Sequence, residues 1–235
     1  MKNKSFKRFI GVLFVVLAAT SQALCALSPE NVKPEHHYDV SVRLDVPLAL
    51  GITLTSALGV YRYYSMERVS AGNLKPKAEF LPWDRPFVGH YSGWATTVSH
   101  YTGALAVAPL ALAGYSWYKG DADAHDFGAY ALMFAEAFAL ENALNQIFRS
   151  MQLWPRPFIY AKRGEGAKKA ASARGEAYGS FYSGHASAAF TVAIFTGDWF
   201  SKVYPNSKYK PLVWVSSFAL ASGVAALRVV AGKHY

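Results

Sequence analysis

Four or five apolar stretches of helical length constrain this chain more than any other feature. They cover residues 47–64, 95–118, 127–148, 185–200 and 211–230, with Pro- or Gly-containing links between them. Several approach the roughly 20 apolar residues that a helix needs to cross a bilayer. Small residues recur within the stretches, which favours close packing between helices in lipid. The pattern predicts an all-α, membrane-embedded helical bundle of five to six helices.

Composition supports a single domain over residues 26–235. Hydrophobic residues make up 52% of the chain and charged residues only 17%, which is typical of a domain rich in apolar helix. The formal net charge is nevertheless +9, and basic chains bind either nucleic acid or anionic surfaces. No nucleic-acid-binding module is recognisable in the sequence. We therefore expect phosphate groups and membrane lipids as partners, and no nucleic acid.

The N-terminus has the pattern of a secretory signal peptide, which we place at residues 1–25. Basic residues precede an apolar run, and Ala23-Leu24-Cys25 follows as a cleavage site with small residues. Lipid attachment at Cys25 is the alternative, but Leu24 is bulkier than the usual lipid-attachment motif allows. If cleavage follows Cys25, the mature chain has lost the sole cysteine of the sequence and has no thiol chemistry.

Three polar motifs lie in residues 149–157, 180–185 and 228–234. They contain Arg149, Arg156, Ser183, Gly184, His185, Arg228 and His234. Guanidinium groups stay protonated and bind phosphate oxygens in pairs, so three of them suit a dianionic phosphomonoester. Ser183 and Gly184 directly precede an apolar run, which places their short donors at a helix N-terminus. The motifs therefore predict a phosphate site.

The motifs resemble the signature of the type 2 phosphatidic acid phosphatases, membrane lipid phosphatases that share their fold with the vanadium haloperoxidases. That signature reads Lys-x6-Arg-Pro, Pro-Ser-Gly-His and Ser-Arg-x5-His-x3-Asp, and the resemblance covers residues 128–235. The spacing within each motif is kept, while Arg149, Tyr182 and Leu227 replace the family's Lys, Pro and Ser. The resemblance implies the helical fold of this family and a phosphatase activity.

The resemblance also implies a role for each motif residue. His234 is the expected nucleophile, which takes the phosphoryl group as a phosphohistidine, and His185 is the expected general acid, which protonates the leaving alcohol. The expected phosphate-binding residues are Arg149, Arg156, Ser183, Gly184 and Arg228. The other histidines lack such neighbours in the sequence and are interpreted as surface or interface residues: His36, His37, His90, His100 and His125.

A nucleophilic histidine needs a hydrogen-bond acceptor for its other ring nitrogen. In the family this acceptor is the Asp of the third motif, which would stand three positions after Tyr235, the last residue given. We expect the sequence to be a fragment that continues into a further helix carrying this Asp. The alternative is a chain that ends at Tyr235 and is catalytically impaired. The given chain by itself is expected to be weakly active or inactive.

Two carboxylates, a loop and an arginine accompany the motifs. Glu136 and Glu141 lie on one apolar stretch, where they either line a wet cavity or form helix–helix hydrogen bonds, the second being preferred. Residues 159–179 carry five basic residues and are interpreted as a flexible loop over the site entrance or as an ordinary solvated loop. Arg85 is expected in an interface loop, in contact with a headgroup or with water.

The combined interpretation is a metal-independent phosphatase, a multi-pass protein of the bacterial cell-envelope membrane. The expected substrate is a lipid phosphate monoester or pyrophosphate, and no cofactor or metal is expected because no Asp, His and Cys cluster has metal-ligand spacing. By analogy with the family, the active site is expected on the periplasmic side. Two alternatives remain open: a catalytically impaired phosphate-lipid binding protein and, less favoured, a vanadate-dependent haloperoxidase. Neither the lipid nor the oligomeric state follows from the sequence.

Overall fold

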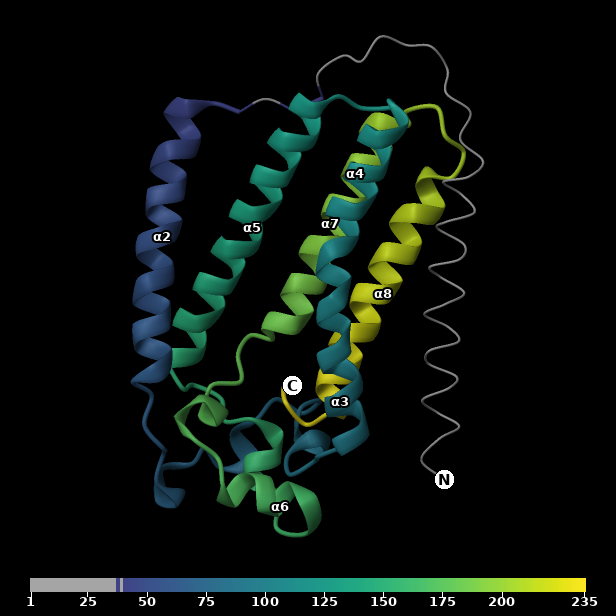
Figure 1. Cartoon of the computed structure of the whole chain (residues 1–235). Coiled ribbons are helices and arrows are strands. Elements are labelled where there is room, and N and C mark those ends of the chain that lie inside the picture. Colours follow the sequence, from purple (N-terminus) through teal and green to yellow (C-terminus); the bar gives the residue numbers. More distant parts are fainter. Residues whose placement is uncertain (1–36, 39) are drawn as a thin grey trace.

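The computed structural model describes residues 37–38 and 40–235, and this part of the chain contains helices and no strands. The predicted signal peptide at 1–25 and His36 lie outside the described residues. Long helical rods run side by side in a bundle, and the short helix α6 (Gly164–Ala171) lies at one end of it (Figure 1). The all-α class predicted from the sequence is confirmed.

Each predicted apolar stretch corresponds to one rod of the bundle. Four of the rods are single helices: α2 (Val42–Tyr64), α5 (Ala124–Ser150), α7 (Gly184–Val203) and α8 (Lys210–Val230). The fifth rod consists of three consecutive elements: α3 (Gly93–Tyr101), the 3₁₀ helix η4 (Thr102–Val107) and α4 (Ala108–Lys119). The main packing partners are α7 with α8, α2 with α5, and α5 with α7. The motif-bearing ends of α5, α7 and α8 are therefore neighbours.

Two of the observed helices differ from the predicted stretches, and a proline explains the second difference. We predicted a helix from Pro47, but α2 begins at Val42 and includes this proline in its second turn. The stretch 95–118 was expected as one helix, yet η4 interrupts it just before Pro109 at the start of α4. Because proline has no N–H and its ring clashes with the carbonyl four residues earlier, the α-helical hydrogen-bond ladder is broken there.

Side-chain caps begin the two helices that carry most of the site. Asp123 caps α5 by accepting a hydrogen bond from the Asp126 N–H at 2.8 Å. Ser183 caps α7, where its hydroxyl oxygen accepts from the Ala186 N–H at 3.4 Å. Such caps satisfy N–H groups that have no partner within the helix. The predicted helix N-terminus at the Ser183-Gly184 string is confirmed.

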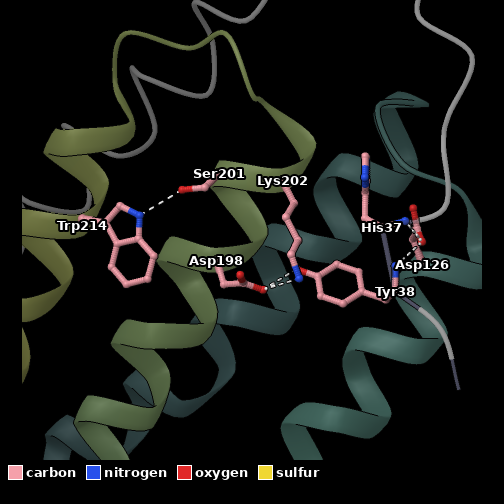
Figure 2. Close-up of polar contacts among 7 residues, drawn as sticks. All are labelled: His37, Tyr38, Asp126, Asp198, Ser201, Lys202 and Trp214. Carbon is pink, nitrogen blue, oxygen red and sulfur yellow. Dashed lines mark hydrogen bonds and ion pairs between the residues drawn. The ribbon is translucent and has the colours of Figure 1, made fainter. Parts of the chain in front are cut away.

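A cluster of aromatic and small residues packs the end of the bundle farthest from α6. The rings of Tyr38 and Trp199 stack with centroids 5.6 Å apart, and Ala113, Ala129 and Tyr130 surround them in the same buried cluster. Figure 2 shows the polar contacts beside this cluster, which tie the segment before α2 to α5 and α7. The core at this end therefore joins helices that are distant in the sequence.

Among the described helices, α8 has the length and apolar composition of a membrane span. The other predicted spans do not meet the same criterion, although all of them form helices. This one helix gives the predicted membrane embedding limited support.

Candidate active site

The three motifs converge on one cavity of about 480 Å³. The helix ends that carry the motifs lie at the end of the bundle where the C-terminus and α6 are (Figure 1). Six of the seven predicted site residues line it: Arg149, Arg156, Gly184, His185, Arg228 and His234. They come from the last turns of α5 and α8, the first turn of α7, and two connecting segments. The seventh, Ser183, serves as the cap of α7 and is not among the lining residues.

Close packing against α5 explains the glycine in the second motif. A Cβ atom on Gly184 would lie 2.9 Å from the side-chain oxygen of Asn145, which is closer than real Cβ contacts allow. The Asn145 amide in turn donates to the Tyr182 carbonyl at 2.6 Å, so it holds the segment before α7 against α5. Asn145 also lines the cavity and was not predicted. The first turn of α7 is thereby fixed beside Arg149.

A tight turn after α8 folds His234 back into the cavity. The N–H groups of Lys233 and His234 both donate to the Arg228 carbonyl, at 3.1 and 3.3 Å. Gly232 has a φ of +66°, and a Cβ there would lie 2.0 Å from the His90 carbonyl oxygen, so only glycine fits. The spacing of the third motif therefore brings His234 close to Arg228, although the helix ends between them.

The imidazole of His234 is buried and held by a backbone carbonyl. Only 4% of this residue is exposed, and its Nδ1 lies 2.5 Å from the Ser180 carbonyl oxygen. A carbonyl can only accept, so Nδ1 carries the hydrogen and Nε2 keeps its free electron pair. The acceptor that the resemblance assigns to an Asp beyond Tyr235 is thus supplied by the second motif. No side-chain pattern in the sequence could have indicated it.

Two of the three arginines are held in place by neutral groups. Arg228 is 3% exposed, and its Nη1 donates to the hydroxyl of Ser99 on α3 at 2.9 Å. Arg149 donates from Nε to the Gly179 carbonyl at 3.2 Å and from Nη2 to the Tyr63 hydroxyl at 3.3 Å. The Tyr63 ring also lies 4.7 Å from its guanidinium carbon. Neither Tyr63 nor Ser99 was predicted as a site residue.

No carboxylate in the described part of the chain neutralises the positive charge of the three arginines. None of them forms an ion pair with a carboxylate among the described residues. The Nε atoms of Arg156 and Arg228 are buried and have no hydrogen-bond partner in the described part of the chain. Because an unpaired buried donor is unfavourable, these N–H groups are available for an anion in the cavity.

Burial and mutual repulsion disfavour the charged forms of the basic groups around this cavity. Desolvation, and then the charges of Arg149 and Arg228, lower the pKa of Arg156 to about 9. Desolvation and the charges of Arg156 and Arg228 lower the pKa of Lys233 to about 8 and hold the pKa of His234 well below its usual value. His234 is therefore neutral near pH 7, which is the form that can attack phosphorus.

A second imidazole faces His185 in the cavity. The rings of His185 and His100 have centroids 5.5 Å apart and an interplanar angle of 71°. Both residues line the cavity. His100 is exposed, in agreement with its interpretation as a surface residue, but its position in the cavity was not predicted. His90 and His37 do contact other parts of the fold, through a ring nitrogen 2.9 Å from the Val230 carbonyl and through a backbone N–H.

The part of the cavity away from the arginines is mainly apolar. Its lining there includes Leu105, Phe138, Ala188 and Val192 from η4, α5 and α7. Glu141 also lines the cavity and accepts a hydrogen bond from the Ser187 hydroxyl on α7. The preferred interpretation of Glu141 as a helix–helix hydrogen-bond partner is confirmed, and its position in the cavity agrees with the alternative as well.

Two neighbouring basic segments differ from the sequence-based interpretation. Residues 159–179 contain the end of the 3₁₀ helix η5 (Pro157–Tyr160), α6 and the 3₁₀ helix η6 (Gly175–Tyr178), where we predicted a flexible loop over the site entrance or an ordinary solvated loop. None of the five basic residues of this segment lines the cavity. Arg85 donates to the carbonyls of Phe80 at 2.9 Å and Ala78 at 2.7 Å, so it stabilises its own loop.

One group of potential metal ligands, not recognised from sequence spacing, occurs at the start of α5. Asp123, His125 and Asp126 have potential ligand atoms within 4.8 Å of one another. Asp123 caps the helix, and Asp126 accepts from the backbone N–H groups of His37 and Tyr38 at 2.8 and 3.2 Å. These contacts give the carboxylates a structural role away from the cavity.

Comparison with known proteins agrees with the motifs. The family model of the PAP2 superfamily matches residues 130–235, which include α7, α8, most of α5 and all three motifs. No curated protein and no solved structure matched the chain. The matched segment does not include Tyr63 and His100, which line the cavity from the preceding helices, or Ser99, which accepts a hydrogen bond from Arg228.

Proposed function

Residues 130–235 belong to the PAP2 superfamily, and from this premise we propose that the protein is a phosphatase that acts through a phosphohistidine without a metal ion. Membership of the superfamily indicates a phosphoester hydrolase. One observation carries the more specific proposal: three arginines without ion-pair partners among the described residues surround two imidazoles in one cavity. A phosphate dianion supplies the negative charge that this arrangement lacks.

The proposed phosphate position is between the guanidinium groups and the first turn of α7. The buried Nε atoms of Arg156 and Arg228 donate to two phosphate oxygens, and the remaining Nη1 of Arg149 donates to another. The transition state of phosphoryl transfer spreads negative charge over the equatorial oxygens, so donors fixed in advance stabilise it. Hydrogen bonds to Ser99 and Tyr63 keep two of these arginines in place before the substrate arrives.

In the proposed mechanism one histidine forms the bond to phosphorus and the other transfers the protons. The Nε2 electron pair of His234 attacks phosphorus while the bond from phosphorus to the leaving oxygen breaks, and His185 gives its proton to that oxygen. The phosphorylated imidazole is cationic, and the Ser180 carbonyl stabilises its Nδ1–H. Water then attacks phosphorus, His185 takes one proton from it, and the bond from phosphorus to His234 breaks to release phosphate.

The apolar surfaces support a lipid phosphate monoester or pyrophosphate as the substrate. One end of the cavity is apolar, so an acyl or prenyl chain attached to the phosphate would contact Leu105 and Phe138. On α2 a stripe of residues at helical spacing faces outward, with Leu50 61%, Leu54 72% and Tyr61 72% exposed. Exposed apolar area of this extent is typical of a membrane contact. We accordingly propose a multi-pass protein of a bacterial envelope membrane with a periplasmic site.

Phosphate release from a panel of lipid phosphates, in EDTA, tests the proposed function. The protein is compared with its His185→Ala and His234→Ala variants, and His37→Ala is the matched control because only its backbone N–H has a defined contact. We expect both site variants to lose at least about a hundredfold in kcat and the control to keep its rate. Tight binding of lipid phosphate without release by the parent protein would instead favour the binding-protein alternative.

A further inference from the structure

The general acid proposed for this site has a second imidazole as its neighbour. His100 lies in the last turn of α3, outside the segment matched by the PAP2 model, and lines the same cavity. Its ring lies edge to face with that of His185, with centroids 5.5 Å apart. His100 is exposed, whereas His185 is partly buried. A solvent-accessible imidazole therefore stands directly against the proton donor.

The two proposed catalytic imidazoles are held in different ways. His234 has its Nδ1 hydrogen-bonded to the Ser180 carbonyl. The ring of His185 has no hydrogen-bond partner within the described part of the chain, and its ring contact there is with His100. Orientation by a neighbouring group is what a general acid needs in order to deliver a proton along one direction. For His185 that neighbour is His100.

None of the other charged groups around this pair could replace His100 in exchanging protons with His185. The titratable groups that face the cavity from α5, α7, α8 and the connecting segments are Glu141, Arg149, Arg156, His185, Arg228 and His234, with Lys233 behind them. Arginines cannot accept a proton, and the carboxylate of Glu141 is hydrogen-bonded to Ser187. Among these side chains, an imidazole is the one whose ordinary pKa near 6.5 suits proton exchange with another imidazole.

We propose that His100 is a positioning residue for His185, which holds the general acid edge to face and transfers protons between it and solvent. In the free protein, before substrate binds, a proton moves from the imidazolium of His100 to the unprotonated ring nitrogen of His185, and solvent then protonates His100 again. During turnover His185 gives this proton to the leaving oxygen and regains one from the attacking water, so His100 acts only when His185 has lost its proton between turnovers. The proposal rests on the phosphatase function proposed above. It assigns a role in catalysis to the part of the chain before residue 130.

Leaving-group dependence tests this role. His100→Phe keeps an aromatic ring against His185 but removes both nitrogens, and His37→Phe is the matched control at the other end of the bundle. With an alkyl phosphomonoester, whose leaving oxygen needs a proton, we expect kcat to fall about tenfold, a part of the general-acid contribution. With p-nitrophenyl phosphate, whose leaving group departs without a proton, we expect less than about a twofold change. Inhibition by orthovanadate should stay unchanged.

Further readouts separate positioning from simple structural damage. The pH profile of kcat for the alkyl substrate should change shape in His100→Phe, and added imidazole should restore part of the rate in His100→Ala. Equal losses on both substrates together with weaker vanadate inhibition would show that His100 binds phosphate, which overturns the proposal. An unchanged substrate ratio and pH profile would overturn it too. If the parent protein releases no phosphate from either substrate, the proposed function itself fails, and this role falls with it.

Discussion

The two ends of the bundle differ in whether the protein itself supplies partners for their charged groups. At the end drawn in Figure 2, the Tyr38 hydroxyl donates to Asp198 at 2.8 Å, and the Asp198 carboxylate pairs with Lys202 at 3.2 Å. Asp126 accepts from the backbone N–H of Tyr38 at 3.2 Å. Each of these charges therefore has a partner that the protein itself supplies.

At the motif end, several basic side chains lie close together and have no carboxylate partner among the described residues. Arg156 and Arg228 keep buried Nε atoms without an acceptor in the described part of the chain, and Lys233 lies over the Phe158 ring at 4.5 Å. An unpaired buried charge lowers the stability of the folded state, so a site shaped by stability alone would pair these cations with carboxylates. The contrast indicates that charges with partners inside the protein mark the structural end of this bundle, and that cations without a carboxylate partner among the described residues mark the binding end.

The largest expected effect comes from removing one unpaired cation. Arg156→Met keeps most of the side-chain volume, and we expect a loss of about 100- to 1,000-fold in kcat, since a preorganised donor to the transition state is gone. The unfolding temperature should rise, because the buried charge is also gone. Arg85→Met, at an arginine bound to backbone carbonyls, is the control and should keep its activity. Full activity in Arg156→Met would remove the basis of the comparison.

Anion binding should stabilise the folded protein through contacts at the motif end alone. Orthovanadate at about 100 times its Kd should add about 2.7 kcal/mol to the free energy of unfolding, because it binds the folded state. Thermal unfolding in detergent, with and without the anion, measures this shift. Arg156→Met should lose most of it, and Tyr38→Phe, at the other end, should retain it. Equal shifts in both variants would place the anion outside the cavity.

The pH dependence of stability should report on His234. Burial holds its folded-state pKa well below the unfolded value of about 6.5. Below pH 6.5 the unfolded chain therefore binds a proton that the folded chain does not, so stability falls as the pH falls, by up to about 1.4 kcal/mol per pH unit.

Denaturation at several pH values between 6.5 and the folded-state pKa would measure this slope. His234→Asn can still donate to the Ser180 carbonyl but does not titrate, so its slope should be smaller by up to one proton. An identical slope in the two proteins would mean that His234 is charged in the folded state, contrary to the site described above.

The smallest effect is expected at the satisfied end. Tyr38→Phe removes the hydroxyl that donates to Asp198 but leaves the ring stacked on Trp199 and the pair between Asp198 and Lys202. The free energy of unfolding should fall by about 1 kcal/mol, as for one lost hydrogen bond. Phosphatase activity should be unchanged. A loss of activity as large as that of Arg156→Met would show that the two ends are coupled.

Local patterns predicted much of the fold and part of the site. The apolar stretches correspond to the rods of the bundle, and the Ser183-Gly184 string begins α7 as expected. These features depend on neighbours within a few turns, which a single sequence displays. The break at η4 and the helix α6 were missed, because the first depends on one proline and the second on packing against η5.

Other site residues had no local signal at all. Tyr63, Ser99 and Asn145 are ordinary helical residues in the sequence, and they hold the site only because α2, α3 and α5 surround the ends of α7 and α8. The position of His100 at the cavity was missed for the same reason. The contact between Ser99 and Arg228 joins residues 129 positions apart. Such contacts belong to the packing of helices and not to a motif.

The sequence by itself determined the helical class, the match of residues 130–235 to the PAP2 superfamily model, and the residue types that suit phosphate chemistry. Only the tertiary structure decided which of those residues meet in one cavity, which acceptor holds His234, and which cations remain unpaired. The physical reason is that charge and helix propensity are properties of a residue and its near neighbours. Burial and pairing are properties of the space around a side chain, which helices from the whole chain enclose.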